Sequence, residues 1–128
     1  MRRGEGEATL LRMDALDFQS VLATVEAEQE RTARQVAWLE EIVATIVEGS
    51  ELTSTDDEHD PEGATIAYER AQAIALLRQA RADWDALVIT RHQLNERGQV
   101  VCSVCRHEID LERVAALPTT TRCVRCAA

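Results

Sequence analysis

The chain has 128 residues, of which 45% are hydrophobic and only 3% are aromatic. This composition suits one small helical domain and argues against an aromatic platform for stacking nucleic-acid bases. All 14 basic residues are arginines, against 23 acidic residues, and the net charge is −9. Because phosphate binding depends on Lys and Arg, this balance argues against direct sequence-specific binding of DNA and favours a partner with a basic surface.

Neither a membrane span nor a signal peptide is predicted. No segment contains the roughly 18 consecutive apolar residues that a membrane span needs. The basic first residues, Arg2 and Arg3, are not followed by the apolar run of a signal peptide. We therefore predict a cytoplasmic protein without membrane contact.

Residues 1–13 contain glycines and show no regular hydrophobic period, so we predict a flexible N-terminus there. The following segment predicts a long helix whose seam residues alternate between spacings of three and four, the pattern of a coiled coil. These residues are Leu22, Val25, Gln29, Thr32, Val36, Leu39, Val43 and Ile46. Two of them are polar and interrupt the seam, and Gly49 is predicted to end the helix.

A second helix is predicted after a turn-rich acidic segment, residues 49–62. Asp60 suits the N-cap, Pro61 the first helical position, and Gly98 the C-terminal stop after about Arg97. Its seam has the same alternating spacing and consists of Ile66, Arg70, Ala73, Leu77, Ala80, Trp84, Leu87, Arg91 and Leu94. The predicted fold is therefore mainly α: residues 14–97 form a long antiparallel coiled-coil helical hairpin, with helices of about 50–55 Å. We predict a monomer, and a four-helix bundle formed by dimerisation is the alternative.

Residues 98–128 are predicted to form a C4 zinc finger. Cys102 and Cys105 form one C-x₂-C pair, and Cys123 and Cys126 form a second. A two-residue gap lets both sulfurs of a pair face one ion, and two pairs complete a tetrahedron. One Zn²⁺ per chain would then be structural, because no ligand position stays open, and it would supply most of the folding free energy of this segment.

Other chemistries of four cysteines remain alternatives. Two disulfides would need an oxidising compartment, a redox pair would need a βαβ context, and an iron–sulfur cluster also takes four thiolates. We interpret the neighbouring His107 as a bystander. We also predict that the protein is not an enzyme, because no nucleophile–base pair is visible.

The finger resembles the DksA/TraR C4-type zinc-finger family. The resemblance covers roughly residues 18–127, and its most specific part is the pattern Cys102-x₂-Cys105, Ile109-x₃-Arg113, Ala116-x-Pro118 and Cys123-x₂-Cys126. Residues 56–64 resemble the family's hairpin tip, which carries an Asp-x-x-Asp-x-Ala motif. Asp57 and Asp60 match its two aspartates, Glu62 replaces its alanine, and Arg106 replaces a glycine that often follows the second cysteine.

The resemblance implies a transcription regulator that binds RNA polymerase. The hairpin would enter the secondary channel, and the tip residues Asp57, Asp60 and Glu62 would approach the catalytic magnesium and modulate initiation. The residues themselves agree with this role, since residues 48–69 hold eight acids and no Arg or Lys. Members of the family often act with the alarmone ppGpp, which makes ppGpp a candidate ligand. The alternative is a zinc-finger adaptor whose hairpin docks another protein, without a role in transcription.

Overall fold

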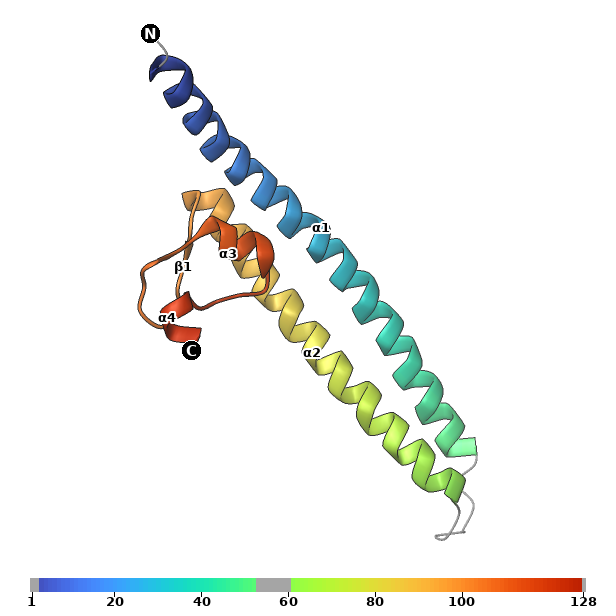
Figure 1. Cartoon of the computed structure of the whole chain (residues 1–128). Helices are drawn as coiled ribbons and strands as arrows, with labels where there is room; N and C mark the ends of the chain where they lie inside the picture. Colours follow the sequence, from blue (N-terminus) through green and yellow to red (C-terminus); the bar gives the residue numbers. More distant parts are fainter. Residues whose placement is uncertain (1–2, 53–60, 128) are drawn as a thin grey trace. The chain divides into compact units, whose positions relative to one another are not determined.

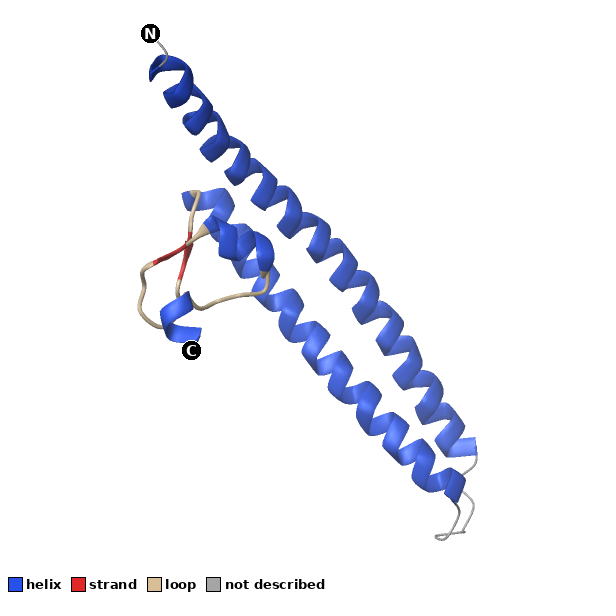
Figure 2. Ribbon diagram, in the orientation of Figure 1, coloured by secondary structure: helices blue, strands red, loops and turns tan. Residues whose placement is uncertain are grey.

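A computed structural model of the chain describes the backbone of residues 3–52 and 61–127, and the side chains of residues 18–49 and 63–127. The element order is α1 (Arg3–Leu52), α2 (Pro61–Arg97), β1 (Val100–Val101), β2 (Glu108–Ile109), α3 (Leu111–Ala116) and α4 (Val124–Ala127) (Figures 1 and 2). The chain divides into two compact units. Unit 1 comprises Met1–Glu30 and Trp84–Ala128, and unit 2 comprises Arg31–Asp83.

Helix α1 is longer at both ends than the sequence predicts. It begins at Arg3, whereas residues 1–13 were expected to be a flexible start. Glu, Ala, Leu and Met dominate this segment, and their helix propensity outweighs that of two glycines. At the other end Gly49 does not stop the helix, which continues to Leu52. The prediction of a C-terminal cap at Gly49 is therefore wrong.

Helix α2 has the bounds that its capping residues predict. It begins at Pro61 and ends at Arg97. Gly98 then adopts a φ of 68°, and its N–H donates to the Leu94 carbonyl at 2.9 Å. This left-handed glycine satisfies a carbonyl that the last helical turn leaves without a partner. In the described part of the chain, no helix is long and apolar enough to cross a membrane.

Within unit 1, α1 and α2 pack along the predicted seam. Val25 of α1 and Leu87 and Leu94 of α2 are fully buried, with Val21 beside them. The polar seam residue Gln29 is buried too, and its Oε1 accepts a hydrogen bond of 3.1 Å from Nη1 of Arg91. The polar interruption of the seam thus has a partner across the helix pair.

Within unit 2, the seam is smaller and entirely helical. Leu39 of α1 packs with Leu77 and Ala80 of α2, and Val36 and Val43 flank this cluster. An ion pair of 3.1 Å joins Arg81 and Glu40, two exposed side chains on different helices. Together the two units confirm a mainly helical fold in which two long helices pack against each other.

The finger follows α2 as a small hairpin and two short helices. Strands β1 and β2 are antiparallel and pair Val100 with Ile109 and Val101 with Glu108. Val100, Ile109 and Val114 of α3 are buried together with Val25, Leu87 and Leu94 of the helices, in one cluster. Within unit 1, the finger therefore packs on α1 and α2 through a shared apolar core.

Candidate metal centre

The first pair of cysteines lies in the turn that joins β1 to β2. The N–H of Cys102 donates to the His107 carbonyl at 2.8 Å, and the N–H of Arg106 donates to the Cys102 carbonyl at 3.1 Å. These bonds close the turn around Cys105. Arg106 has a φ of 66°, the left-handed conformation that L-residues with a side chain adopt at a cost. A tight reversal after the second cysteine thus brings both sulfurs to one side.

The second pair lies at the start of α4, and its backbone is held from several directions. The N–H of Cys126 donates to the Cys123 carbonyl at 3.1 Å. Nε of Arg113, on α3, donates to the Arg122 carbonyl at 2.9 Å, and the Thr120 hydroxyl donates to the same carbonyl at 2.9 Å. The N–H of Ser103 donates to the Thr121 carbonyl at 2.8 Å, which joins the two cysteine-bearing loops.

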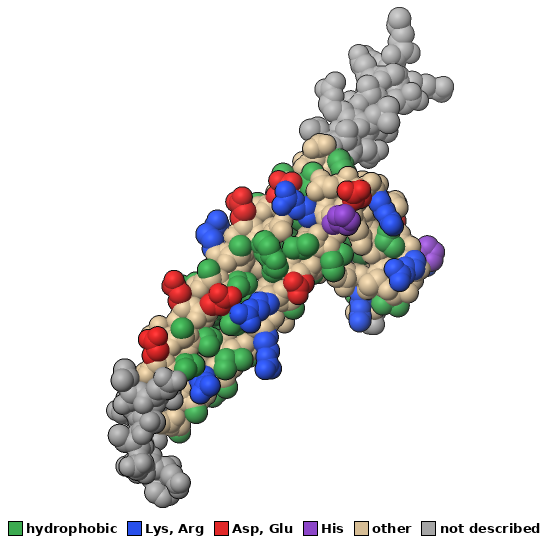
Figure 3. Space-filling view, turned by 180° about the vertical axis from the view of Figure 1, so that it is seen from behind, with side chains coloured by type: hydrophobic (Ala, Val, Ile, Leu, Met, Phe, Trp, Pro, Cys, Tyr) green, Lys and Arg blue, Asp and Glu red, His purple; other side chains and the backbone are tan. Residues whose placement is uncertain are grey.

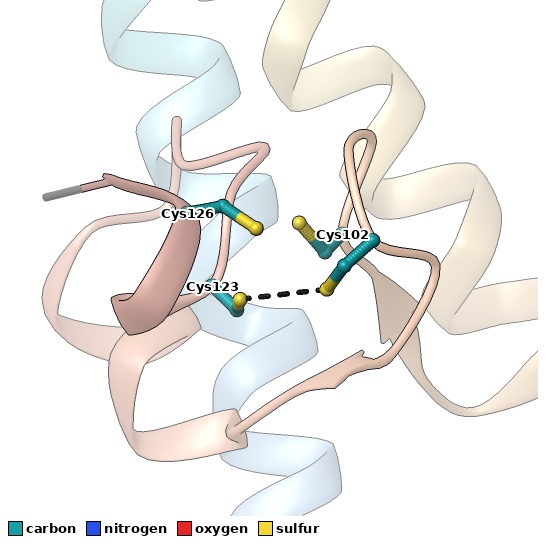
Figure 4. A group of neighbouring side chains, drawn as sticks. Cys102, Cys123 and Cys126 are labelled. Carbon is teal, nitrogen blue, oxygen red and sulfur yellow. Dashed lines mark hydrogen bonds between the residues drawn. The ribbon is translucent and has the colours of Figure 1, made fainter.

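The four sulfur atoms form one cluster. All Sγ atoms lie within 4.8 Å of one another, and those of Cys105 and Cys123 are 3.6 Å apart. Figure 4 shows the sulfurs of Cys102, Cys123 and Cys126 directed toward a common centre, and a dashed line marks the contact between Cys105 and Cys123. A tetrahedral Zn²⁺ with Zn–S bonds of about 2.3 Å places its ligand sulfurs about 3.8 Å apart. The observed spacing fits this ion, and four thiolates leave no position for a substrate.

Hydrogen bonds at the cluster shift the pKa values of its thiols in opposite directions. The backbone N–H groups of Cys105 and Cys123 favour the thiolate of Cys102 and lower its pKa to about 5. The pKa of Cys123 is lowered too, chiefly by the N–H of Cys126. The pKa of Cys126 is raised to about 12, because its thiol donates to the Cys123 sulfur and is partly buried. Backbone N–H groups thus favour negative sulfur at Cys102 and Cys123, the form in which cysteine binds a metal.

The sequence predicted the four ligands but not the residues that hold them in place. Arg113 and Thr120 support the second cysteine pair, and Gln93 of α2 accepts a hydrogen bond of 2.8 Å from the N–H of Val101. Only the position of Arg113 in the family pattern could have suggested such a role. His107 is exposed and lies outside the sulfur cluster.

The structure does not describe the side chains of the predicted tip residues. Asp57 and Asp60 lie outside the described residues. The backbone of Glu62 belongs to α2, but its side chain also lies outside the described part of the chain.

Two packed helices followed by a closed four-thiolate site define the class: a helical-hairpin protein with a structural zinc finger. Residues 96–128 match the model of the prokaryotic dksA/traR C4-type zinc finger, so this segment is similar to the zinc finger of that family. The family recognition made from the sequence is confirmed by this match, which begins at the end of α2. One structural Zn²⁺ bound by the four cysteines accords with both the family and the sulfur cluster. No curated protein and no solved structure matches the chain.

Proposed function

We propose that the protein is a regulator of transcription that binds RNA polymerase through the secondary channel. The observation that carries this proposal is the DksA/TraR zinc finger at residues 96–128, joined directly to a pair of long packed helices. The family suggests regulation of transcription in association with RNA polymerase. The closed metal site supports a structural role for zinc and gives no support to metal-based catalysis.

The segment between the two helices is proposed to act on initiation. Asp57, Asp60 and Glu62 lie there, in the stretch of eight acids between residues 48 and 69. Carboxylates are ligands for Mg²⁺ and are attracted to basic channels, so these side chains suit the neighbourhood of a polymerase active site. We further propose that the protein is a cytoplasmic monomer and that ppGpp is a candidate co-effector.

The proposal is tested by separating binding from effect. Core RNA polymerase should retain the zinc-loaded wild-type chain and the Asp57→Ala/Asp60→Ala variant equally well, because the rest of the helix pair and the finger remain. In an in vitro transcription assay, the wild-type chain should change the yield of initiated transcripts, and the Asp57→Ala/Asp60→Ala variant should not. Glu30→Ala, a substitution of an exposed acid on α1 far along the chain from the tip, serves as the matched control. Failure of the polymerase to retain the wild-type chain would refute the proposal.

An adaptor that docks another protein through its helices is the second candidate, and one surface of unit 2 favours it. Trp38 is 61% exposed and Leu76 is 49% exposed, and both line a shallow groove of about 250 Å³ together with Ile42 and Ile46. Exposed Trp is a common anchor of protein interfaces. If the adaptor is correct, Trp38→Ala should abolish capture of a partner other than polymerase, while Asp57→Ala/Asp60→Ala should have no effect.

A further inference from the structure

The shallow groove of unit 2 lies between α1 and α2 and is lined mostly by apolar side chains. Trp38, Ile42 and Ile46 follow one another at intervals of four residues, so they lie in one row along α1. Ala73 and Leu76 of α2 form part of the facing wall. The volume of about 250 Å³ is below the roughly 300–1,000 Å³ of small-molecule sites, so the groove suits side chains of another protein better than a free small molecule.

The apolar side chains of the groove remain in contact with water. Three large hydrophobic side chains are exposed in the described part of unit 2, and two of them, Trp38 and Leu76, line the groove. On the face that Figure 3 presents, hydrophobic side chains lie along the helix pair, with acidic and basic ones beside them. A partner that covered Trp38 and Leu76 would remove apolar surface from water, which favours binding.

One carboxylate determines the charge that such a partner needs. Among the residues that the structure describes, Glu69 is the only charged one that lines the groove. A partner that covers the groove takes water away from this carboxylate, which then needs a cation beside it. Glu41 is an exposed acid three residues after Trp38, and the two are therefore neighbours on the surface of α1. The partner must accordingly supply Lys or Arg next to its apolar side chains.

The charge of the chain argues against a second copy in the groove. Each copy has a net charge of −9, and residues 48–69 hold eight acids without Arg or Lys. Two copies that met through this groove would bring a second Glu69 into the interface and would repel each other. A basic partner would be attracted by the same charges.

We infer that the groove of unit 2 binds one amphipathic helix of a partner protein, in which Lys or Arg flanks the apolar side chains. The row from Trp38 to Ile46 is about 12 Å long, so two to three turns of the helix, about 8 to 11 residues, contact it. Apolar side chains at spacings of three and four residues pack against Trp38 and Leu76, and the cations pair with Glu69 and Glu41. This binding is independent of the proposed action of the tip on initiation.

The test uses two synthetic helices of about 18 residues with the same leucine stripe, flanked by lysine in one and by glutamate in the other. Each is titrated into the zinc-loaded full chain with Trp84→Phe, which leaves Trp38 as the only tryptophan of the two. The lysine-flanked helix should shift the fluorescence of Trp38 to shorter wavelength and saturate at one helix per chain, because the indole leaves water. The glutamate-flanked helix should bind at least about tenfold more weakly.

Matched variants assign the binding to the groove in calorimetric titrations with the lysine-flanked helix. Trp38→Ala should weaken binding by about tenfold or more, and Tyr68→Ala, at an exposed aromatic residue outside the groove, by less than about twofold. Glu69→Gln should weaken binding by about fivefold or more, because a charge pair is lost. Asp85→Asn removes an exposed charge of α2 outside the groove and should change affinity by less than about twofold. Circular dichroism should show equal helix content in all variants.

Four results would overturn this assignment: no saturable shift with the lysine-flanked helix, equal binding of both helices, equal loss in Tyr68→Ala or Asp85→Asn, or a loss in Asp57→Ala/Asp60→Ala. The last result would place the binding on the acidic segment between the helices. A shift of Trp38 fluorescence with protein concentration alone, together with dimers in sedimentation velocity, would also overturn it and assign the groove to a second copy of the chain.

Discussion

At the scale of single residues, two glycines show how position determines what a glycine contributes. Gly98 has a φ of 68° and ends α2, whereas Gly49 lies inside α1, where a right-handed helical conformation suits any L-residue. A Cβ at Gly98 would lie 3.6 Å from Cε2 of Phe18, an ordinary contact, and a Cβ at Gly49 would meet no atom within 4 Å. Steric clash is therefore absent at both positions, and only the backbone conformation differs.

The same substitution should thus have opposite effects at the two glycines. Gly98→Ala should lower the free energy of unfolding by about 1 kcal/mol, because an alanine in the left-handed region is strained. Gly49→Ala should raise it by about 0.5–1 kcal/mol, because alanine has the higher helix propensity. Chemical denaturation of the zinc-loaded variants measures both changes. Stabilisation by Gly98→Ala would contradict the observed backbone conformation.

Acid should release zinc only well below neutral pH. The pKa of Cys102 is lowered from an ordinary value of 9.0 to about 5, so its thiolate stabilises the folded finger above the unfolded pKa. That contribution decreases as the pH falls from about 9 and is lost as the pH passes through about 5. Zinc binding itself favours the thiolates of all four cysteines, so zinc should stay bound at neutral pH and be released in acid, as measured with a colorimetric chelator. Release of most of the zinc above about pH 7 would contradict this expectation.

At the scale of the elements, the seam of α2 separates two neighbouring leucines. Leu77 is buried between the helices of unit 2, whereas Leu76 is 49% exposed. Leu77→Ala should cost about 2–3 kcal/mol of stability, since it removes buried methyl groups and leaves a cavity. Leu76→Ala should cost less than about 1 kcal/mol, because its side chain is half exposed already. Thermal unfolding measures both, and equal losses would mean that the predicted seam does not separate the two positions.

The seam was predictable because its spacing is a local property of the sequence. Five of the eight seam positions of the second helix that lie between residues 70 and 94 are buried: Ala73, Leu77, Ala80, Leu87 and Leu94. The exposed positions are the two arginines, whose charge remains in contact with water. Thr90 lies off the seam and is nevertheless buried, and it lines a cleft between α2 and the finger. Periodicity within one helix carries no information about a later segment that packs on it.

In the finger, too, local motifs were predictable from the sequence and contacts between distant residues were not. Its four ligands were predictable because each C-x₂-C pair is a local motif with one common geometry. The strands β1 and β2 contain two residues each, and their pairing depends on the turn between them. The hydrogen bond from Arg113 to the Arg122 carbonyl likewise joins residues nine positions apart. Contacts of this kind follow from the folded finger and leave no period in the sequence.

At the scale of the whole molecule, the two units differ in how much of their core depends on zinc. The core of unit 1 combines Val25, Leu87 and Leu94 of the long helices with finger residues, which include the ligands Cys102 and Cys123. The core of unit 2 contains only residues of α1 and α2. A metal ion that holds the finger together therefore also supports the helices of unit 1, and it contributes no contact to the core of unit 2.

Removing zinc should accordingly loosen the chain in a graded way. With a chelator present, amide hydrogen exchange should become fast throughout residues 98–127, because this segment has little core without its metal. Exchange in residues 18–30 and 84–97 should accelerate by about tenfold or more, since these helices lose the apolar partners supplied by the finger. Residues 31–48 and 63–83 should keep their protection, and Cys102→Ser should reproduce the pattern without a chelator. Loss of protection in both units together would mean that zinc stabilises one cooperative structure, and restored protection after zinc is added back would exclude damage by the chelator.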